Sequence, residues 1–378
     1  MSTIIRTRSP YFIRTPNETS GTLSYFQIVI QTWGGTSGSI DVCANLYSST
    51  TLNKKILGTE NSVSFDISEI VNDHLVQTFN GTYSASQTTQ SLWVYVSTSA
   101  RTSDGSIIGS ATNTTFLAQE GYNLYKEGVN YTTEPTAMLS ANYIQYQKGS
   151  AVTIPVNAER VTSVKWRDGT SVRETDSFTD SGDSNQKIQY AQFTSSTLLD
   201  NALITYDGGS TTTITLDPIE ECKYPVNKIT FLNRWGALQD LFFFKKSIET
   251  LDTRREKYNA SIFEARKVVT SDPEEVGEPC SESITYNTYS TTAHAKKTFN
   301  ANATESIELN SGFVNELMNP FYEELMVSEN IWLTDSDSVI YPVNLKDSSF
   351  TYKTSLNEKL INYTMSFEKA FDLVNNIR

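Results

Sequence analysis

Alternating apolar and polar positions recur along the first half of the chain and predict short β-strands between turns. Alternation bounded by Gly, Ser and Asn is typical of strands that are buried on one face. We expect such strands over residues 23–30, 39–47, 62–66 and 91–100. Asp168-Gly169 and Asp207-Gly208-Gly209 each separate two alternating runs, so each predicts a β-hairpin. Short strands at this spacing indicate β-sandwiches.

The densest apolar and aromatic stretch, residues 228–250, is expected to form the floor of the main core. We interpret it as two strands, 228–233 and 240–250, joined by a bend at Trp235-Gly236. Each apolar side chain in it would stabilise the fold by roughly 1.5–3 kcal/mol when buried. These side chains are Ile229, Phe231, Trp235, Leu238, Leu241, Phe242, Phe243 and Phe244. An aromatic platform for a sugar is the alternative, and the apolar context favours the core.

Two segments follow a helical period. Residues 67–75 carry apolar positions three and four apart after a capping signal at Asp66-Ile67-Ser68-Glu69, and predict one short helix. Residues 312–327 predict an amphipathic helix packed on a sheet. Its apolar ridge consists of Phe313, Leu317, Phe321 and Leu325. Pro320 interrupts this helix, which should be kinked there or restart with Asn319 as its cap.

Together these patterns predict a mainly β protein of three domains. Two N-terminal immunoglobulin- or fibronectin-like β-sandwiches are expected, the first over residues 1–118 with the short helix and the second over 136–218. Residues 119–135 lose the periodicity and are interpreted as a structured linker. Residues 219–378 are expected to form a C-terminal β-sandwich or barrel-like domain with helix 312–327 packed on it.

The C-terminal region also contains segments of strongly polar character. Residues 251–268 are predicted to form a charged strand or arm, and acidic Ser271–Glu282 is expected to be a loop because of its prolines and charges. Strands are predicted over 283–289 and 293–300. The last part of the chain predicts an antiparallel meander of three strands.

Composition narrows the classes of function. The net charge of −13 argues against a surface that wraps nucleic acid, because such surfaces need clustered Lys and Arg. Three cysteines, Cys43, Cys222 and Cys280, have no metal-binding spacing and cannot all pair, so buried free thiols are favoured. No apolar run approaches the length of a membrane span. We therefore expect synthesis in a cytoplasm and no membrane insertion.

Candidate catalytic residues are sparse. The chain has two histidines, His74 and His294, and neither belongs to a nucleophile, zinc or phosphate-loop motif. Acidic groups such as 180–183 and 335–337 are better explained as turns than as calcium ligands. A carboxylate pair for glycoside cleavage is spatial and is not visible in a sequence. We expect no enzymatic activity, no cofactor and no metal.

Several phrases of the chain resemble structural proteins of tailed bacteriophages. They are RSPYFIR, FDISEIV, GYNLYKEGVN, KITFLNRWGALQDLFFFKK, ENIWL and YPVNLKDSSFTYKTSLNEKLINYTMSFEKAF, and they span most of the chain. The resemblance implies a virion protein of the tail or baseplate whose C-terminal domain is similar to tail-tube or distal-tail folds. Such domains build rings around the DNA channel, and acidic charge suits a lumen that conducts DNA.

The function expected from this resemblance is that of a structural subunit of a phage tail, in the baseplate, hub or neck. Its partners would be copies of itself in a ring and other tail proteins, without specific binding of nucleic acid. A receptor- or carbohydrate-binding adhesin of the virion is the alternative, and a cell-wall glycosidase ranks last. The charged arm is expected to contact a neighbouring subunit. The predicted contact residues are Arg254, Arg255, Tyr258, Ile262, Phe263 and Arg266.

Overall fold

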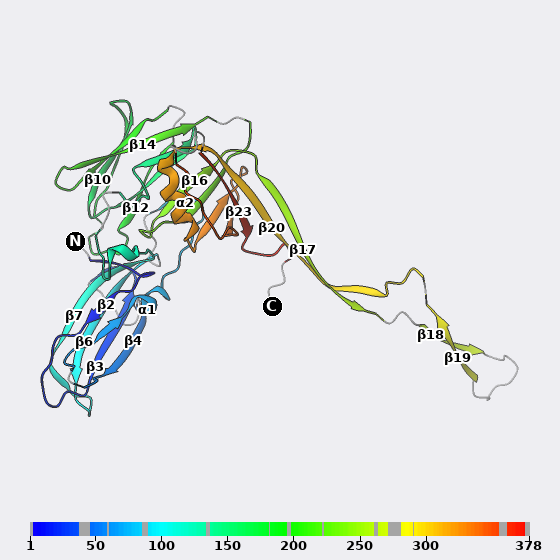
Figure 1. The fold of residues 1–378 in the computed structure, drawn as a ribbon, viewed down its shortest axis with the longest axis horizontal. Helices are drawn as coiled ribbons and strands as arrows, with labels where there is room; N and C mark the ends of the chain where they lie inside the picture. The colour runs from blue at the N-terminus through cyan, green and yellow to red at the C-terminus, as the bar shows by residue number, and fades with distance from the viewer. Residues whose placement is uncertain are drawn as a thin grey trace. The chain divides into compact units, whose positions relative to one another are not determined.

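The computed structural model of the chain describes twelve segments, whose folds are drawn in Figure 1. They are residues 3–37, 46–58, 60–84, 90–133, 137–180, 182–194, 198–220, 223–260, 264–270, 281–289, 291–354 and 361–374. For residues 46–47, 264–270 and 281–288 only the backbone is described. The protein is mainly β, as predicted, and its few helical segments are short.

The first sheet contains five strands in the order β1-β7-β6-β3-β4. These are β1 (Ile4–Arg6), β7 (Ile107–Gln119), β6 (Ser91–Arg101), β3 (Tyr25–Trp33) and β4 (Leu46–Lys55). Strand β1 runs parallel to β7, and the other pairs are antiparallel. A second pair, β2 (Phe12–Arg14) and β5 (Ser64–Asp66), accompanies helix α1 (Ser68–Asn72). One apolar core joins both sets of strands with α1.

The sequence located most of this first region. The strands predicted over 23–30, 62–66 and 91–100 are confirmed as β3, β5 and β6, and the predicted helix is shorter than expected. Most of the strand predicted over 39–47 lies outside the described residues. Strand β7 was missed, because its first half is exposed and rich in Thr and Asn, so it carries little apolar alternation.

The second sheet has the order β11-β10-β13-β14-β8 and faces the pair β12-β9 across a shared core. The strands are β8 (Tyr143–Gln147), β9 (Ala151–Asn157), β10 (Val161–Asp168), β11 (Ser171–Ser177), β12 (Ile188–Thr194), β13 (Asn201–Tyr206) and β14 (Thr211–Ile219). Both predicted hairpins are confirmed, since β10 pairs with β11 and β13 with β14 on either side of their Gly turns.

The third sheet has the order β16-β15-β21-β22-β23-β20-β17. Its strands are β15 (Asn227–Leu232), β16 (Leu238–Phe243), β17 (Ile248–Asn259), β20 (Lys296–Val314), β21 (Ile331–Thr334), β22 (Ile340–Leu345) and β23 (Ile361–Lys369). The predicted C-terminal meander is confirmed as β21, β22 and β23. The strand predicted over 240–250 is wrong, because β16 ends at Phe243 and a separate strand begins at Ile248.

The central stretch is apolar without alternation because β16 is buried on both faces. Phe242 and Phe244 belong to the core of the second sheet. Phe243, which points to the other side, contacts the rings of Tyr322 and Phe367 at centroid distances of 6.3 and 6.1 Å. A strand covered on both sides needs apolar side chains at consecutive positions. The second and third sheets therefore share a core.

The helix predicted over 312–327 is correct only in its second half. Strand β20 continues to Val314, a 3-10 turn η2 (Glu316–Met318) follows, and α2 spans Asn319–Met326 with Pro320 in its first turn. The restart at the proline is confirmed, although Met318 and not Asn319 is the N-cap. The Asn319 side chain instead bonds Lys353 O at 2.9 Å and Tyr363 Oη at 2.5 Å. Phe313 and Leu317 are each 54% exposed, so they are not on a buried ridge.

Contacts divide the chain into two compact units. The first, which we call the body, comprises Met1–Ile248 and Glu308–Ala370. The second, the arm, comprises Glu249–Ile307 and Phe371–Arg378. Within the arm, β17 neighbours β20, and β18 (Glu264–Thr270) pairs with β19 (Ser281–Thr288). The three-domain boundaries stay predictions, and the predicted loop over 271–282 lies almost entirely outside the described residues.

Candidate functional site

The predicted contact residues lie on the arm. Arg254, Arg255 and Tyr258 are all exposed on β17. Arg266 lies in β18, of which only the backbone is described. Ile262 and Phe263 lie outside the described residues. The structure therefore places half of the predicted set on one strand and leaves the role of all six as a prediction.

The arm has almost no interior of its own. Among the arm residues whose side chains are described, Ala303 is the single buried one. Tyr258 is 48% exposed and Phe299, from the neighbouring strand β20, is 64% exposed. Their rings meet edge to face at 6.0 Å. This aromatic pair is a cross-strand contact between β17 and β20 in which neither ring is buried.

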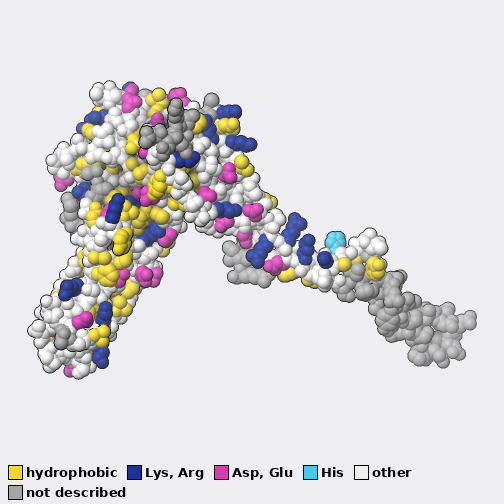
Figure 2. All heavy atoms as spheres, viewed as in Figure 1, with side chains coloured by type: hydrophobic (Ala, Val, Ile, Leu, Met, Phe, Trp, Pro, Cys, Tyr) yellow, Lys and Arg dark blue, Asp and Glu magenta, His cyan; other side chains and the backbone are white. Residues whose placement is uncertain are grey.

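Positive side chains gather around this pair. Arg254, Arg255 and Lys257 lie on β17, and Lys296 and Lys297 on β20; Figure 2 shows Lys and Arg side chains along this part of the chain. Glu256, half-buried, lies 3.7 Å from Arg254. Because exposed ion pairs contribute only about 0–1 kcal/mol, the aromatic pair is the stronger candidate for an anchor. We call these six charged residues with Tyr258 and Phe299 the arm band.

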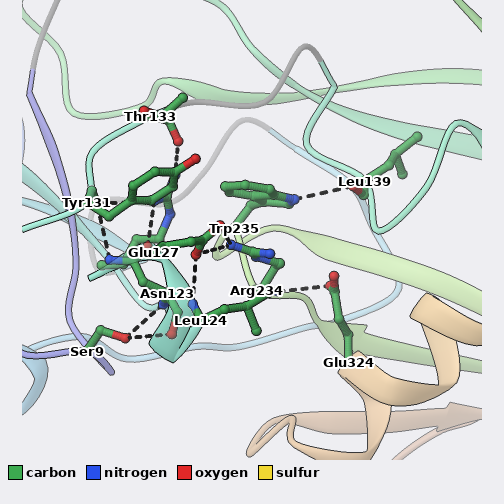
Figure 3. Close-up of polar contacts among 11 residues, drawn as sticks. Ser9, Asn123, Leu124, Glu127, Tyr131, Thr133, Leu139, Arg234, Trp235 and Glu324 are labelled. Atoms are coloured by element: carbon green, nitrogen blue, oxygen red, sulfur yellow. Dashed lines mark hydrogen bonds and ion pairs between the residues drawn. The ribbon is translucent and has the colours of Figure 1, made fainter. Parts of the chain in front are cut away.

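A second polar cluster, which we call the joint, lies in the body where the end of the first sheet meets the third sheet (Figure 3). It comprises Arg6, Glu120, Gly121, Tyr122, Asn123, Glu127, Arg234, Trp235, Gly236 and Glu324. Arg6 is buried at 2% exposure and lies 4.5 Å from the Trp235 ring centroid. It donates to Asn123 Oδ1 at 2.8 Å and to Thr133 O at 2.9 Å. Burial of an Arg requires such bonds, because an unpaired buried charge is costly.

The bend between β15 and β16 supplies the other half of the joint. The Arg234 guanidinium pairs with Glu127 of the 3-10 turn η1 (Tyr125–Glu127) at 2.7 Å and lies 4.3 Å from the Trp235 ring centroid. Two guanidinium groups therefore lie within cation–π distance of the Trp235 ring. Trp235 is half-buried, which corrects the expectation that its ring is a fully buried part of the main core.

Backbones approach closely at the joint, which requires glycine. A Cβ on Gly121 would lie 2.5 Å from Arg234 O. Gly236 has φ +78° and a Cβ there would lie 3.2 Å from Glu120 O. Main-chain bonds cross the same gap, since Tyr122 N donates to Arg234 O at 2.9 Å. The predicted linker, residues 119–135, is itself part of the body, and its described residues bond to the bend between β15 and β16.

Two carboxyl groups of the joint have altered acidity. Burial raises the pKa of Glu120 to about 7, and the neighbouring Glu329 carboxylate adds to the effect. Burial likewise raises the pKa of Glu324 to about 7, against the opposing effect of the hydrogen bond from Arg234 N. Both side chains are 6% exposed. These groups change charge near neutral pH.

A third cluster has the composition of a catalytic site without its properties. Asp240 accepts from Tyr83 Oη and from Thr230 Oγ1, and Lys228 Nζ lies 3.5 Å from its carboxylate. Burial raises the pKa of Tyr83 well above its ordinary value, so the phenol is less ionised than in water. This arrangement ties the segment before β6 to β15 and β16.

Across the twelve described segments, no group of three or more His, Cys, Asp or Glu side chains is placed to hold a metal ion. Of the helices in those segments, none has the length and apolar character needed to cross a membrane. His294 lies exposed on the arm and His74 follows α1.

Comparison with known proteins gives no family. No protein-family model matches the chain, and no curated protein matches it in sequence. Sequence reasoning found the arm from its charge, but missed the joint, whose residues lie more than a hundred positions apart.

Proposed function

We propose that this chain is a structural subunit of the tail of a tailed bacteriophage, located in the baseplate, hub or neck ring, which assembles through repeated contacts between copies. On this proposal the first and second sheets belong to immunoglobulin- or fibronectin-like sandwiches. The third sheet with α2 belongs to a domain of the tail-tube or distal-tail type. Other tail proteins are further partners, and the virion is the location.

One observation carries the proposal: Ala303 is the single buried residue among the arm residues whose side chains are described. Twelve consecutive residues of β17 contain no buried position. An exposed strand of this length with aromatic and apolar side chains is a surface that other chains can cover. Ile248 and Leu251 at the start of β17 are about half exposed, at 50% and 51%, and extend the apolar character beyond Tyr258. A solvated hairpin is the simpler interpretation of the same arm.

The proposal is tested by the oligomeric state of the full-length chain. Mass photometry and negative-stain images should show rings or other repeated assemblies. The double substitution Tyr258→Ser with Phe299→Ser should shift the protein towards monomers, because it removes the aromatic anchor from the arm band. Its thermal transition should stay nearly unchanged, since neither ring is buried in the protein's core.

A matched control is Val172→Ser on β11, a 49% exposed apolar residue of the body. It removes a comparable exposed side chain and should leave assembly intact. Assembly that survives the loss of both arm rings would show that the arm is not the contact. Dispersed monomers at every concentration would contradict the proposed subunit role and favour the adhesin.

A further inference from the structure

The joint contains two buried carboxyl groups without a counter-ion of their own. Glu120 follows β7 at the end of the first sheet, and Glu324 lies on α2. Within the described segments neither forms an ion pair, although two arginines lie close by. A buried carboxyl without a paired cation is most stable in its protonated, neutral form.

Glu120 is surrounded by groups that are already engaged. Its Oε1 accepts from Asn330 Nδ2 at 2.8 Å, and Gln77 also bonds its side chain. Arg8, the nearest cation, pairs with the exposed Glu329 at 2.8 Å and donates to Val327 O at 2.8 Å. The Glu329 charge therefore opposes ionisation of Glu120 and occupies the cation that would favour it.

Glu324 has a similar environment. Its Oε2 accepts from Arg234 N at 3.1 Å, and this bond and the Ser140 side chain lower the Glu324 pKa less than burial raises it. The Arg234 guanidinium is held instead by Glu127. Glu323 on the same helix opposes ionisation, and the Tyr122 phenol, which faces Glu324 from the segment after β7, is neutral near pH 7. Ionisation of Glu324 would thus place a buried negative charge at the joint, in addition to that of an ionised Glu120.

We propose that Glu120 and Glu324 make the joint proton-controlled, so that the end of the first sheet is docked on the third sheet when both carboxyls are protonated and is released when they ionise. Release brings both carboxylates into water, where they are stable as anions. The inference is independent of the assembly proposed above.

The geometry favours local release over unfolding of the body. The first sheet and the second sheet have their own apolar cores, and these include no residue of the joint. Across the joint, Tyr122 N donates to Arg234 O at 2.9 Å, and the Gly121 backbone closely approaches that of Arg234. Such polar contacts separate more easily than a packed core.

Hydrogen exchange of the full-length protein tests the proposal. The reporters are the amide of Tyr122, which donates to Arg234 O across the joint, and the amide of Arg234, which donates to the Glu324 carboxyl group itself. The reference is the amide of Val94 in the centre of β6. We expect the protection of the reporters, corrected for intrinsic rates and relative to the reference, to fall about tenfold or more between about pH 5.5 and about pH 8.5.

Substitutions separate proton control from general weakening. Glu120→Gln with Glu324→Gln keeps the hydrogen-bonding shape of the protonated acids, so protection should persist at the higher pH. Glu69→Gln on α1 removes the same charge from an exposed position and should behave like the unsubstituted protein. Gly121→Ala should lower reporter protection at both pH values, which calibrates the released state.

Equal protection of the unsubstituted protein at both pH values would overturn the proposal. An unchanged pH dependence in the double variant would overturn it as well. If the double variant loses protection at Val94 and is therefore misfolded, the two single variants are measured, and each should remove part of the pH dependence. Retention of the full dependence in both single variants would also refute it.

Discussion

Phe243 and Trp235 show how differently two aromatic residues of one stretch are used. Phe243 is fully buried among rings from α2 and β23. Trp235 is half-buried and stacks with Arg6 and Arg234 at the joint. The first ring stabilises the fold by packing, and the second shields two guanidinium groups. Their contributions to stability therefore have different origins.

Phe243→Ala should lower the free energy of unfolding by about 3–5 kcal/mol, because it leaves a cavity between the third sheet and α2. Phe313→Ala is the matched control, since that ring is 54% exposed and its removal should cost little. Denaturant titration of both variants measures the difference. A similar loss in both would mean that Phe243 is not enclosed as described.

At the scale of elements, helix α2 begins later than the apolar spacing predicts, because strand β20 continues to Val314. The apolar spacing predicts one continuous helix from Gly312. Gly312 instead lies in strand β20 with φ +69°, which is not a right-handed helical conformation. The Asn315 side chain then accepts from Leu317 N at 3.0 Å and starts the 3-10 turn. Only after Pro320 does the chain bury the ridge, through Phe321 and Leu325.

The position of α2 predicts effects of very different size for substitutions of two leucines of the expected ridge. Leu325→Ala should destabilise the protein by about 2–5 kcal/mol, because Leu325 is fully buried. Leu317→Ala should have a small effect, because its side chain is 54% exposed. Thermal unfolding of the pair checks the assignment. Comparable losses of stability in both variants would contradict this assignment and favour one continuous amphipathic helix.

At the scale of the whole molecule, the raised pKa values of Glu120 and Glu324 link stability to pH. Between about pH 4.5 and about pH 7 the folded state holds protons that the unfolded chain releases. Stability from these two groups is therefore fully present below their unfolded pKa. It is lost as the pH rises through about 7.

The measurable quantity is the difference between the unsubstituted protein and Glu120→Gln with Glu324→Gln. From about pH 5 to about pH 8 the unsubstituted protein should lose up to about 3 kcal/mol more per group than the double variant. Denaturant titrations across that range give the value. A stability that rises relative to the double variant would contradict the sign of both shifts.

The sequence by itself determined the mainly β class, the two Asp-Gly hairpins, the C-terminal meander and the charged character of the arm. Each depends on neighbours a few residues apart, since turn geometry and strand alternation are local properties. Charge also located β17 and its exposed Arg254, Arg255 and Tyr258.

Only the tertiary structure decided which apolar residues are enclosed and which polar residues meet. Arg6 donates a hydrogen bond to Asn123, and Arg234 donates to Glu127, although each pair is more than a hundred residues apart in the sequence. The spacing of residues along the sequence does not predict such contacts, because they form only when separate sheets pack together. The polar half of β7, the exposure of Phe313 and Leu317, and the burial of Glu120 and Glu324 have the same cause: long-range packing overrides local pattern.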